Sequence, residues 1–194
     1  DIDASPNHLE MSNTKTREAL RAILDEYSLP VLDVCTPLPP NAKELVYAPI
    51  SDENPAVPVV NGRRIVGCGS WLALTVEPLL AYPSCLLAHA APAPSQSSTF
   101  AMQWYASYAI THRRPLYFCR TSVGATTDTY TDATQADQPD MASHYGYWQK
   151  NCNASLRWRA FSGHQVHAST RGPELLAAVA GTHVAMMQRM LMYE

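Results

Sequence analysis

The residue types suited to covalent chemistry gather at Cys68-Gly69-Ser70-Trp71, the segment of the sequence with the features of a presented nucleophile. A thiolate or an alkoxide attacks a carbonyl carbon when a nearby imidazole takes its proton or stabilises its charge. His164 lies in the short polar segment Ser162–His167 and is the candidate base. The candidate catalytic residues are therefore Cys68 or Ser70 as the nucleophile and His164 as the base.

Two segments resemble a known family. Gly69–Leu74 reads Gly-Ser-Trp-Leu-Ala-Leu, which is similar to the Gly-x-Cys-aromatic-Leu sequence that begins the catalytic helix of papain-like viral leader proteases. His164–Tyr193, a histidine followed by a helix, resembles the tail of the self-cleaving members. The resemblance implies a papain-like cysteine hydrolase that processes itself. Ser70 stands where that family has its cysteine, so either Ser70 replaces it or Cys68 acts from a shifted position.

The same stretch of sequence also predicts a β-hairpin. Asn61-Gly62 is a strong hairpin signal, because a type I′ turn needs positive φ at both central residues. The flanking segments Val57–Val60 and Arg63–Val66 have strand-like composition, and Pro78 shortens any helix that would start here. On this hypothesis Cys68 lies on the inner face of a strand that runs on to Val76. The composition favours the hairpin over the catalytic helix.

Other site chemistries find little support. His164 and His167 would point to opposite faces of a strand, and no Cys or His spacing matches a zinc ribbon or finger, so we expect no metal and no cofactor. The sequence has no Gly-rich phosphate loop, dinucleotide fingerprint or Gly-x-Ser-x-Gly elbow. Arginines beside Trp104 and Tyr105 would give an RNA contact its cationic and stacking surfaces, although no RNA-binding signature accompanies them. These arginines would be Arg113, Arg114, Arg157 and Arg159.

Composition places the chain among ordinary globular proteins. Its 194 residues are 46% hydrophobic and carry a formal net charge of −3, so non-specific nucleic-acid binding is not expected. Residues 1–53 hold 10 acidic and 4 basic residues, whereas residues 54–194 hold 7 acidic and 10 basic ones. The five cysteines are odd in number and include no Cys-x-x-Cys, which argues against a disulfide framework. Asn153 begins a glycosylation sequon, and a start at Asp1 suggests a processed or trimmed chain.

The order of expected elements runs from a helix through strands to a second helix. The spacing of Leu20, Ile23 and Leu24 predicts a helix that starts near Thr14 and stops at Leu29-Pro30. Alternation over Phe100–Ile110 favours a strand, with a helix as the alternative. Residues 121–143 are expected to form a long exposed loop, and residues 155–161 alternate as a strand. Gly172-Pro173 opens a final helix, with an apolar stripe of Leu175, Leu176, Val179, Met186, Met187, Met190 and Leu191.

These elements predict an α+β, β-rich fold, an antiparallel sheet or sandwich with an N-terminal helix and a C-terminal helix. Residues 1–58 would form a helix and an extended Pro-rich arm, and residues 59–194 a β-rich core domain that ends in a helix. With no run of 18 or more apolar residues, we expect a soluble chain with no membrane partner.

The leading hypothesis for function is a non-enzymatic structural or interaction protein, such as a viral shell (capsid-type) subunit or a fragment of one. Frequent Trp, Tyr, Met and Arg, which are enriched at interfaces, and an acidic N-terminal part beside a more basic body motivate it. Its partners would be further copies of itself or a larger protein assembly, in a virion or the host cytoplasm. The alternative is the papain-like hydrolase, and a third option, a secreted binding domain, would be supported by sugar on Asn153.

Overall fold

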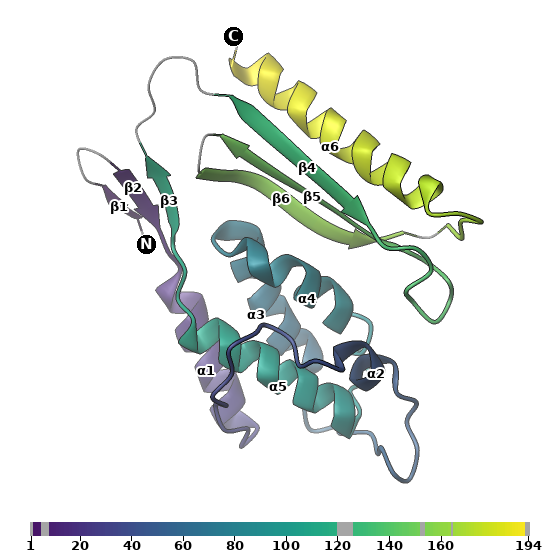
Figure 1. The fold of residues 1–194 in the computed structure, drawn as a ribbon. Helices are drawn as coiled ribbons and strands as arrows, with labels where there is room; N and C mark the ends of the chain where they lie inside the picture. The colour runs from purple at the N-terminus through teal and green to yellow at the C-terminus, as the bar shows by residue number, and fades with distance from the viewer. Residues whose placement is uncertain (1, 5–7, 120–125, 152–153, 164, 193–194) are drawn as a thin grey trace. The chain divides into compact units, whose positions relative to one another are not determined.

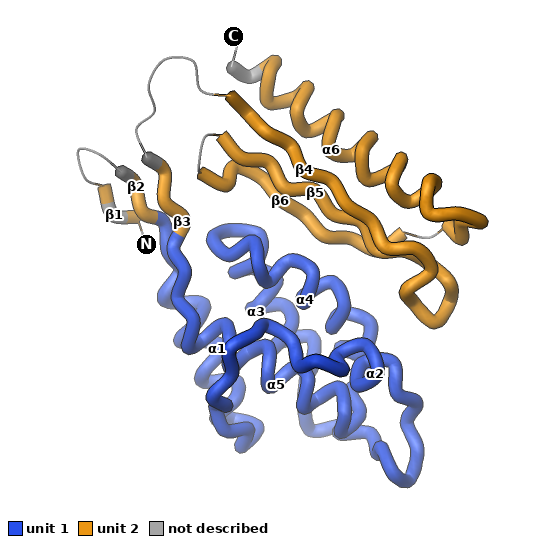
Figure 2. Tube along the Cα trace, viewed as in Figure 1, with its two compact units in different colours: residues 1, 11–115 blue, residues 2–10, 116–194 orange. Residues whose placement is uncertain are grey.

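The computed structural model describes residues 2–4, 8–119, 126–151, 154–163 and 165–192. The chain divides into two compact units, shown in different colours in Figure 2. Unit 1 contains residues 11–115, and unit 2 contains residues 2–10 together with residues 116–194. The division predicted at residue 58 does not coincide with this boundary, because residues 14–58 pack within unit 1.

Unit 1 is a bundle of helices around one apolar core (Figure 1). Its elements are α1 (Thr14–Glu26), α2 (Ala42–Tyr47), α3 (Gly62–Thr75), the 3-10 turn η1 (Pro78–Leu80), α4 (Ala81–Leu87) and α5 (Gln96–Thr111). Helix α1 confirms the expected N-terminal helix. The Asn13 side chain accepts a hydrogen bond from the Thr16 N–H at its start, and Leu20 and Leu24 are fully buried on its inner side.

The hairpin predicted around Asn61-Gly62 is wrong, because this segment opens helix α3. Asn61 has a φ of −87°, whereas a type I′ turn needs a positive φ there. Its side chain accepts a hydrogen bond from the Arg64 N–H at 3.3 Å, so it caps the helix. A Cβ on Gly62 would lie 2.9 Å from the Ala91 carbonyl oxygen, so this close approach explains the glycine. The same Asn-Gly pair thus serves a helix start.

The strand predicted at residues 100–110 is also replaced by a helix, α5. Ser95 and Ser98 form a reciprocal capping box at its start. Tyr105, Ala106 and Ala109 are buried on its sides, along with eight other residues of the helix. A helix buried almost all round carries no 3.6-residue polar period. Its sequence therefore resembles a strand by alternation while it folds as the central helix of unit 1.

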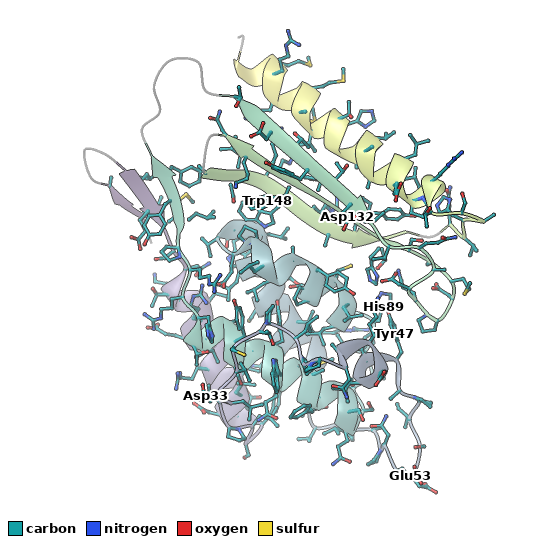
Figure 3. All side chains as sticks on the ribbon, in the orientation of Figure 1. Asp33, Tyr47, Glu53, His89, Asp132 and Trp148 are labelled. Carbon is teal, nitrogen blue, oxygen red and sulfur yellow. The ribbon has the colours of Figure 1, made fainter. Side chains whose placement is uncertain are left out.

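The Pro-rich segment between α1 and α3 lies on the helical core. Val34, Val57 and Val60 pack into or against that core, and the Trp104 indole N–H donates to the Thr36 carbonyl at 2.9 Å. Residues 45–47 of this segment belong to α2. Tyr47 of α2 makes an edge-to-face contact with His89 at 5.6 Å between ring centroids (Figure 3).

Unit 2 contains two three-stranded sheets and a long helix. One sheet joins β1 (Ile2–Ala4), β2 (His8–Met11) and β3 (Leu116–Cys119); the other has β4 (Thr127–Ala133), β5 (His144–Asn151) and β6 (Ala154–Ser162) in that order, antiparallel throughout. Helix α6 (Arg171–Met192) packs along β4 and β5 (Figure 1). Strand β4 lies within the expected loop, because its Thr- and Asp-rich sequence has no apolar alternation to mark a strand.

The predicted α+β class with antiparallel strands and helices near both ends is confirmed. Helices account for 45% of the described residues and strands for 20%, and two segments expected as strands are the helices α3 and α5. In the part of the chain that the structure describes, no helix combines the length and apolarity that a membrane span requires.

Candidate functional site

The two candidate nucleophiles lie in the middle of α3. Cys68 is seven residues into this helix, so the unpaired N–H groups of its first turn, which would stabilise a thiolate, lie well away from the thiol. Ser70 follows two positions later, about 200° further round the helix. Cys68 and Ser70 therefore point to different sides of α3, and one cleft would use only one of them.

Cys68 carries a free thiol at the edge of a shallow cavity of about 330 Å³ between α1 and α3. The cavity is lined by Lys15, Thr16, Ala19, Gly67 and Trp71 besides Cys68. Burial raises the pKa of the Cys68 thiol, and the nearby Arg64 guanidinium opposes this only in part. Arg64 itself is held by Glu26 at 2.8 Å. The thiol is therefore mainly protonated at neutral pH, the opposite of an activated nucleophile.

The candidate base His164 lies outside the described residues. Cys68 and Ser70 belong to unit 1, whereas His164 lies in the sequence range of unit 2. The pairing of Cys68 or Ser70 with His164 therefore stays a prediction. The companion residue His167 is described, and its Nε2 lies 3.2 Å from the Tyr145 hydroxyl.

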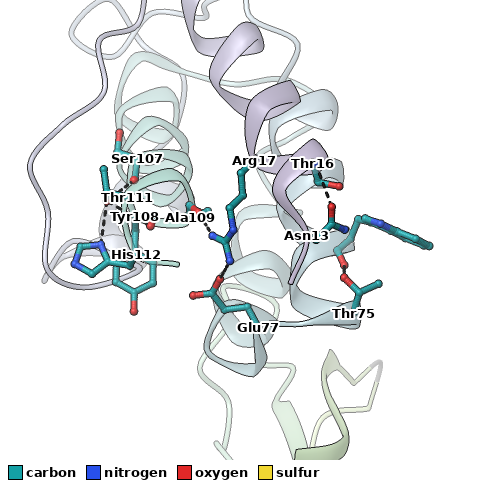
Figure 4. A network of polar contacts seen from close by, with 11 residues as sticks. Asn13, Thr16, Arg17, Thr75, Glu77, Ser107, Tyr108, Ala109, Thr111 and His112 are labelled. Atoms are coloured by element: carbon teal, nitrogen blue, oxygen red, sulfur yellow. Dashed lines mark hydrogen bonds and ion pairs between the residues drawn. The ribbon is translucent and has the colours of Figure 1, made fainter. Parts of the chain in front are cut away.

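A buried ion pair in unit 1 has no counterpart in the sequence analysis. The Arg17 guanidinium contacts a Glu77 carboxylate oxygen at 2.5 Å and donates to the Ala109 carbonyl (Figure 4). Both side chains are almost fully buried, and Glu77 Oε1 has no hydrogen-bond partner among the described residues. Burial raises the pKa of Glu77, and Arg17 opposes that rise. The pair connects α1 with the turn after α3, and Arg17 also contacts α5 through Ala109. Its role is therefore structural.

A second buried polar pair closes the loop between β4 and β5 in unit 2. Both carboxylate oxygens of Asp137 lie 3.0 Å from His144 Nδ1, and His144 is 3% exposed. An aspartate that orients a histidine is one half of a general-base arrangement, but an imidazole this buried does not meet a substrate. Asp137 looked like part of a solvated loop in the sequence. The pairing depends on how residues 134–143 fold back, which no local motif signals.

The four arginines of the predicted RNA contact fall into two pairs in different units. Arg113 and Arg114 are exposed after α5, and Arg157 and Arg159 are exposed on β6. The stacking role expected for Tyr105 is wrong, because this ring is fully buried and its hydroxyl lies 2.5 Å from Ser84 Oγ. The RNA contact itself stays a prediction. Among the described residues, no group of three or more His, Cys, Asp or Glu side chains is arranged to hold a metal ion.

Helix α6 presents an exposed apolar face that its own unit does not cover. Ala177, Gly181 and Val184 are its buried positions against the sheet, and a Cβ on Gly181 would meet Thr131 at 2.4 Å. The described side chains of the predicted apolar stripe lie on the exposed side of the helix. We call these residues with His183 the outer face of α6: Leu175, Leu176, Val179, His183, Met186, Met187 and Met190. Leu191, also predicted for the stripe, has no described side chain.

Small residues explain which side of α6 packs against the sheet. Ala177 and Gly181 lie on the side of α6 that packs on β4 and β5, and even a Cβ at Gly181 would meet Thr131 too closely. The large apolar residues seen in the sequence therefore mark a face of α6 that is exposed. Comparisons with models of known protein families, with curated proteins and with solved structures found no significant match. The outer face of α6 is the candidate site that the geometry supports best.

Proposed function

We propose that the protein is a non-enzymatic structural or interaction protein that associates with further copies of itself through the outer face of α6. The observation that supports the proposal is the exposure of this face, where Met186, Met187 and Met190 are each more than half exposed. Exposed apolar surface of this extent on one helix is typical of an interaction site. A capsid-type subunit is one protein of this class and stays a prediction.

The residues of the outer face favour a second copy as the occupant. Leu176 and Met190 lie the same number of positions on either side of His183, and Val179 and Met187 also form such a pair. An antiparallel pairing of two α6 helices about a two-fold axis at His183 would therefore place Leu176 opposite Met190 and Val179 opposite Met187 on both sides of the axis. The alternating three- and four-residue spacing of Leu176, Val179, His183, Met186 and Met190 is that of a coiled-coil seam.

The test is a comparison of sedimentation velocity for the full chain and two sets of variants. Val179→Gln with Met187→Gln removes two apolar side chains of the outer face from each copy, four in the dimer. At about 1 kcal/mol for each half-exposed side chain, we expect a roughly thousandfold weaker dimer. Leu74→Gln on α3 is the control, because Leu74 is 62% exposed but lies outside the outer face. Equal loss of association in both variants would mean that general stickiness, and not this seam, joins the copies.

His183 tests the symmetry of the pairing. Only a two-fold axis at this position brings the side chain against its own copy, so His183→Lys would place two ammonium groups together, while His183→Leu would bury two apolar side chains. We expect His183→Lys to dissociate the dimer and His183→Leu to tighten it. Equal dimer affinity in both variants would exclude the symmetric register.

The second candidate function is the papain-like cysteine hydrolase, favoured by the cavity beside Cys68. A peptidyl epoxide that alkylates activated thiols is the probe. Labelling of Cys68 that disappears in the His164→Ala variant would support the hydrolase. Absence of labelling, which the raised pKa of the thiol leads us to expect, would leave the interaction protein as the function.

A further inference from the structure

We propose that the outer edge of β4 is a docking site for an extended peptide segment of a partner protein, which would add to the β4-β5-β6 sheet as a fourth strand. The complementary peptide carries basic residues at alternate positions on one face and small apolar residues on the other. This surface shares only Met186 with the outer face of α6, and the proposal does not depend on self-association.

The first support is the position of β4 in its sheet. Among the described strands, β4 has a neighbour, β5, on one side only. Seven residues with exposed side chains at most positions make up this edge, and none is a proline or a lysine, two of the usual devices that block strand addition. Strand addition at an open edge supplies main-chain hydrogen bonds whatever the peptide sequence.

The second support is a groove beside that edge. A cavity of about 350 Å³ lies between β4 and α6. Thr129 and Thr131 form its wall on the strand, and Ala178, Ala185 and Met186 form its wall on the helix. In peptide recognition by strand addition, alternate side chains of the added strand enter such pockets. The size and apolarity of these walls suit Val or Ala side chains, and Arg189 at the groove disfavours a basic residue on this side.

The third support is the charge on the opposite face of β4. Asp128 and Asp132 alternate with the groove residues, so they lie on the face away from α6. Lys150 on β5 is the direct cross-strand partner of Asp128. A basic residue therefore already lies opposite Asp128 on the β5 side of the strand. Asp132, labelled in Figure 3, faces Gly146 and gains no charge partner from β5. A peptide with basic residues four positions apart would match both aspartates.

Tyr130 lies between the two aspartates on the same face of β4. Its ring determines which side chain suits the central position of the peptide. Tyr130 contacts Trp148 on β5 at 5.9 Å between ring centroids, so an aromatic residue opposite Tyr130 would extend this row across the new strand. The complementary core sequence is therefore Lys-Val-Tyr-Val-Lys, with both Val side chains directed to the groove.

A second copy of β4 fits the edge less well. In an antiparallel pair centred on Tyr130, Asp128 of one copy would lie directly opposite Asp132 of the other, at both ends of the contact. Like charges opposite each other destabilise a strand pair. The aspartates thus favour a basic peptide and disfavour pairing of identical edges.

The experiment measures binding of fluorescent nine-residue peptides to the full chain by anisotropy at low salt. One peptide contains Lys-Val-Tyr-Val-Lys, a second has Glu in place of both Lys, and a third is a scrambled form without alternation. We expect binding of the Lys peptide only, weakened roughly fivefold in the double variant Asp128→Asn with Asp132→Asn and by added salt. Charge reversal to Lys at both positions should transfer binding to the Glu peptide.

Three results would overturn the proposal. Binding of the scrambled peptide with the same affinity would show a non-specific surface, and absence of binding by all three would show a closed edge. A rise in the mass of the Asn double variant would show that the aspartates guard against β4 self-pairing. Val179→Gln with Met187→Gln, which disrupts the outer face of α6, serves as the matched control and should leave peptide binding unchanged, so failure of the two proposals can be told apart.

Discussion

At the scale of single residues, the buried ion pair is the most consequential feature of unit 1. Arg17 and Glu77 come from elements 60 positions apart in the sequence and meet at 2.5 Å inside the helical core. A buried charge pair contributes little net stability, but removal of one member leaves the other uncompensated. Arg17 also donates to the Ala109 carbonyl, so its loss would also leave a buried acceptor without its donor.

Glu77→Gln should therefore destabilise the protein by about 3 kcal/mol, because Arg17 would keep its charge in a buried site. The free energy of unfolding from urea titration measures this. The double variant Arg17→Met with Glu77→Leu removes both charges and should recover most of the loss. A single variant as stable as the parent protein would mean that Glu77 does not compensate Arg17.

Cys68 provides a pH-dependent prediction. Burial raises its pKa, so less thiolate is present at pH 7 than for an ordinary cysteine, and the reactive fraction grows only as the pH rises above the usual thiol range. We expect alkylation of Cys68 by iodoacetamide to be slow at pH 7 and to accelerate continuously to pH 10, as followed by peptide mass spectrometry. Fast alkylation at pH 6 would contradict the protonated thiol and favour an activated nucleophile.

At the scale of elements, some segments could be predicted from the sequence and others could not. The apolar residues of α1 recur at helical spacing and those of β6 alternate along the chain, so the type of each element was predicted. Helix α5 is buried on several sides and β4 has exposed side chains at most positions, so neither shows the period of its own structure. Asn61-Gly62 was misinterpreted because Asn favours both turns and helix starts. Only tertiary packing decides between them.

Two glycines of α3 test the packing of this helix with opposite signs. A Cβ on Gly69 would lie 2.1 Å from the Tyr105 hydroxyl, which is buried and bound to Ser84, whereas a Cβ on Gly67 would meet nothing within 4 Å. Gly69→Ala should therefore destabilise unit 1 by about 2 kcal/mol, while Gly67→Ala should stabilise it by about 0.5–1 kcal/mol through helix propensity. The comparison is made by thermal unfolding, and a stabilising Gly69→Ala would contradict the close contact of α3 with Tyr105.

At the scale of the whole molecule, the two units divide the candidate sites between them. Unit 1 holds Cys68 and Ser70, and its residues 11–115 include eight acidic and eight basic residues. The boundary between the two units therefore does not coincide with the change from the acidic residues 1–53 to the more basic remainder. Unit 2 holds both proposed contact surfaces, the outer face of α6 and the edge of β4.

The sequence identified the residues of the α6 stripe but not the surface that they face. Periodicity shows which side chains share a face, but not whether that face meets the chain itself or another molecule. The small residues Ala177 and Gly181, which decide the orientation, carry little hydrophobic signal. The amino-acid pattern could therefore not show that this face of α6 is exposed. The exposed face is the basis of the proposed self-association.

Sedimentation equilibrium of the full chain over a rising concentration series tests that claim most directly. Self-association through α6 predicts that the weight-average mass rises from the 21.4 kDa of one chain toward at least twice that value, and that Val179→Gln with Met187→Gln shifts this rise to much higher concentration. A mass that stays at 21.4 kDa up to the solubility limit would contradict the account.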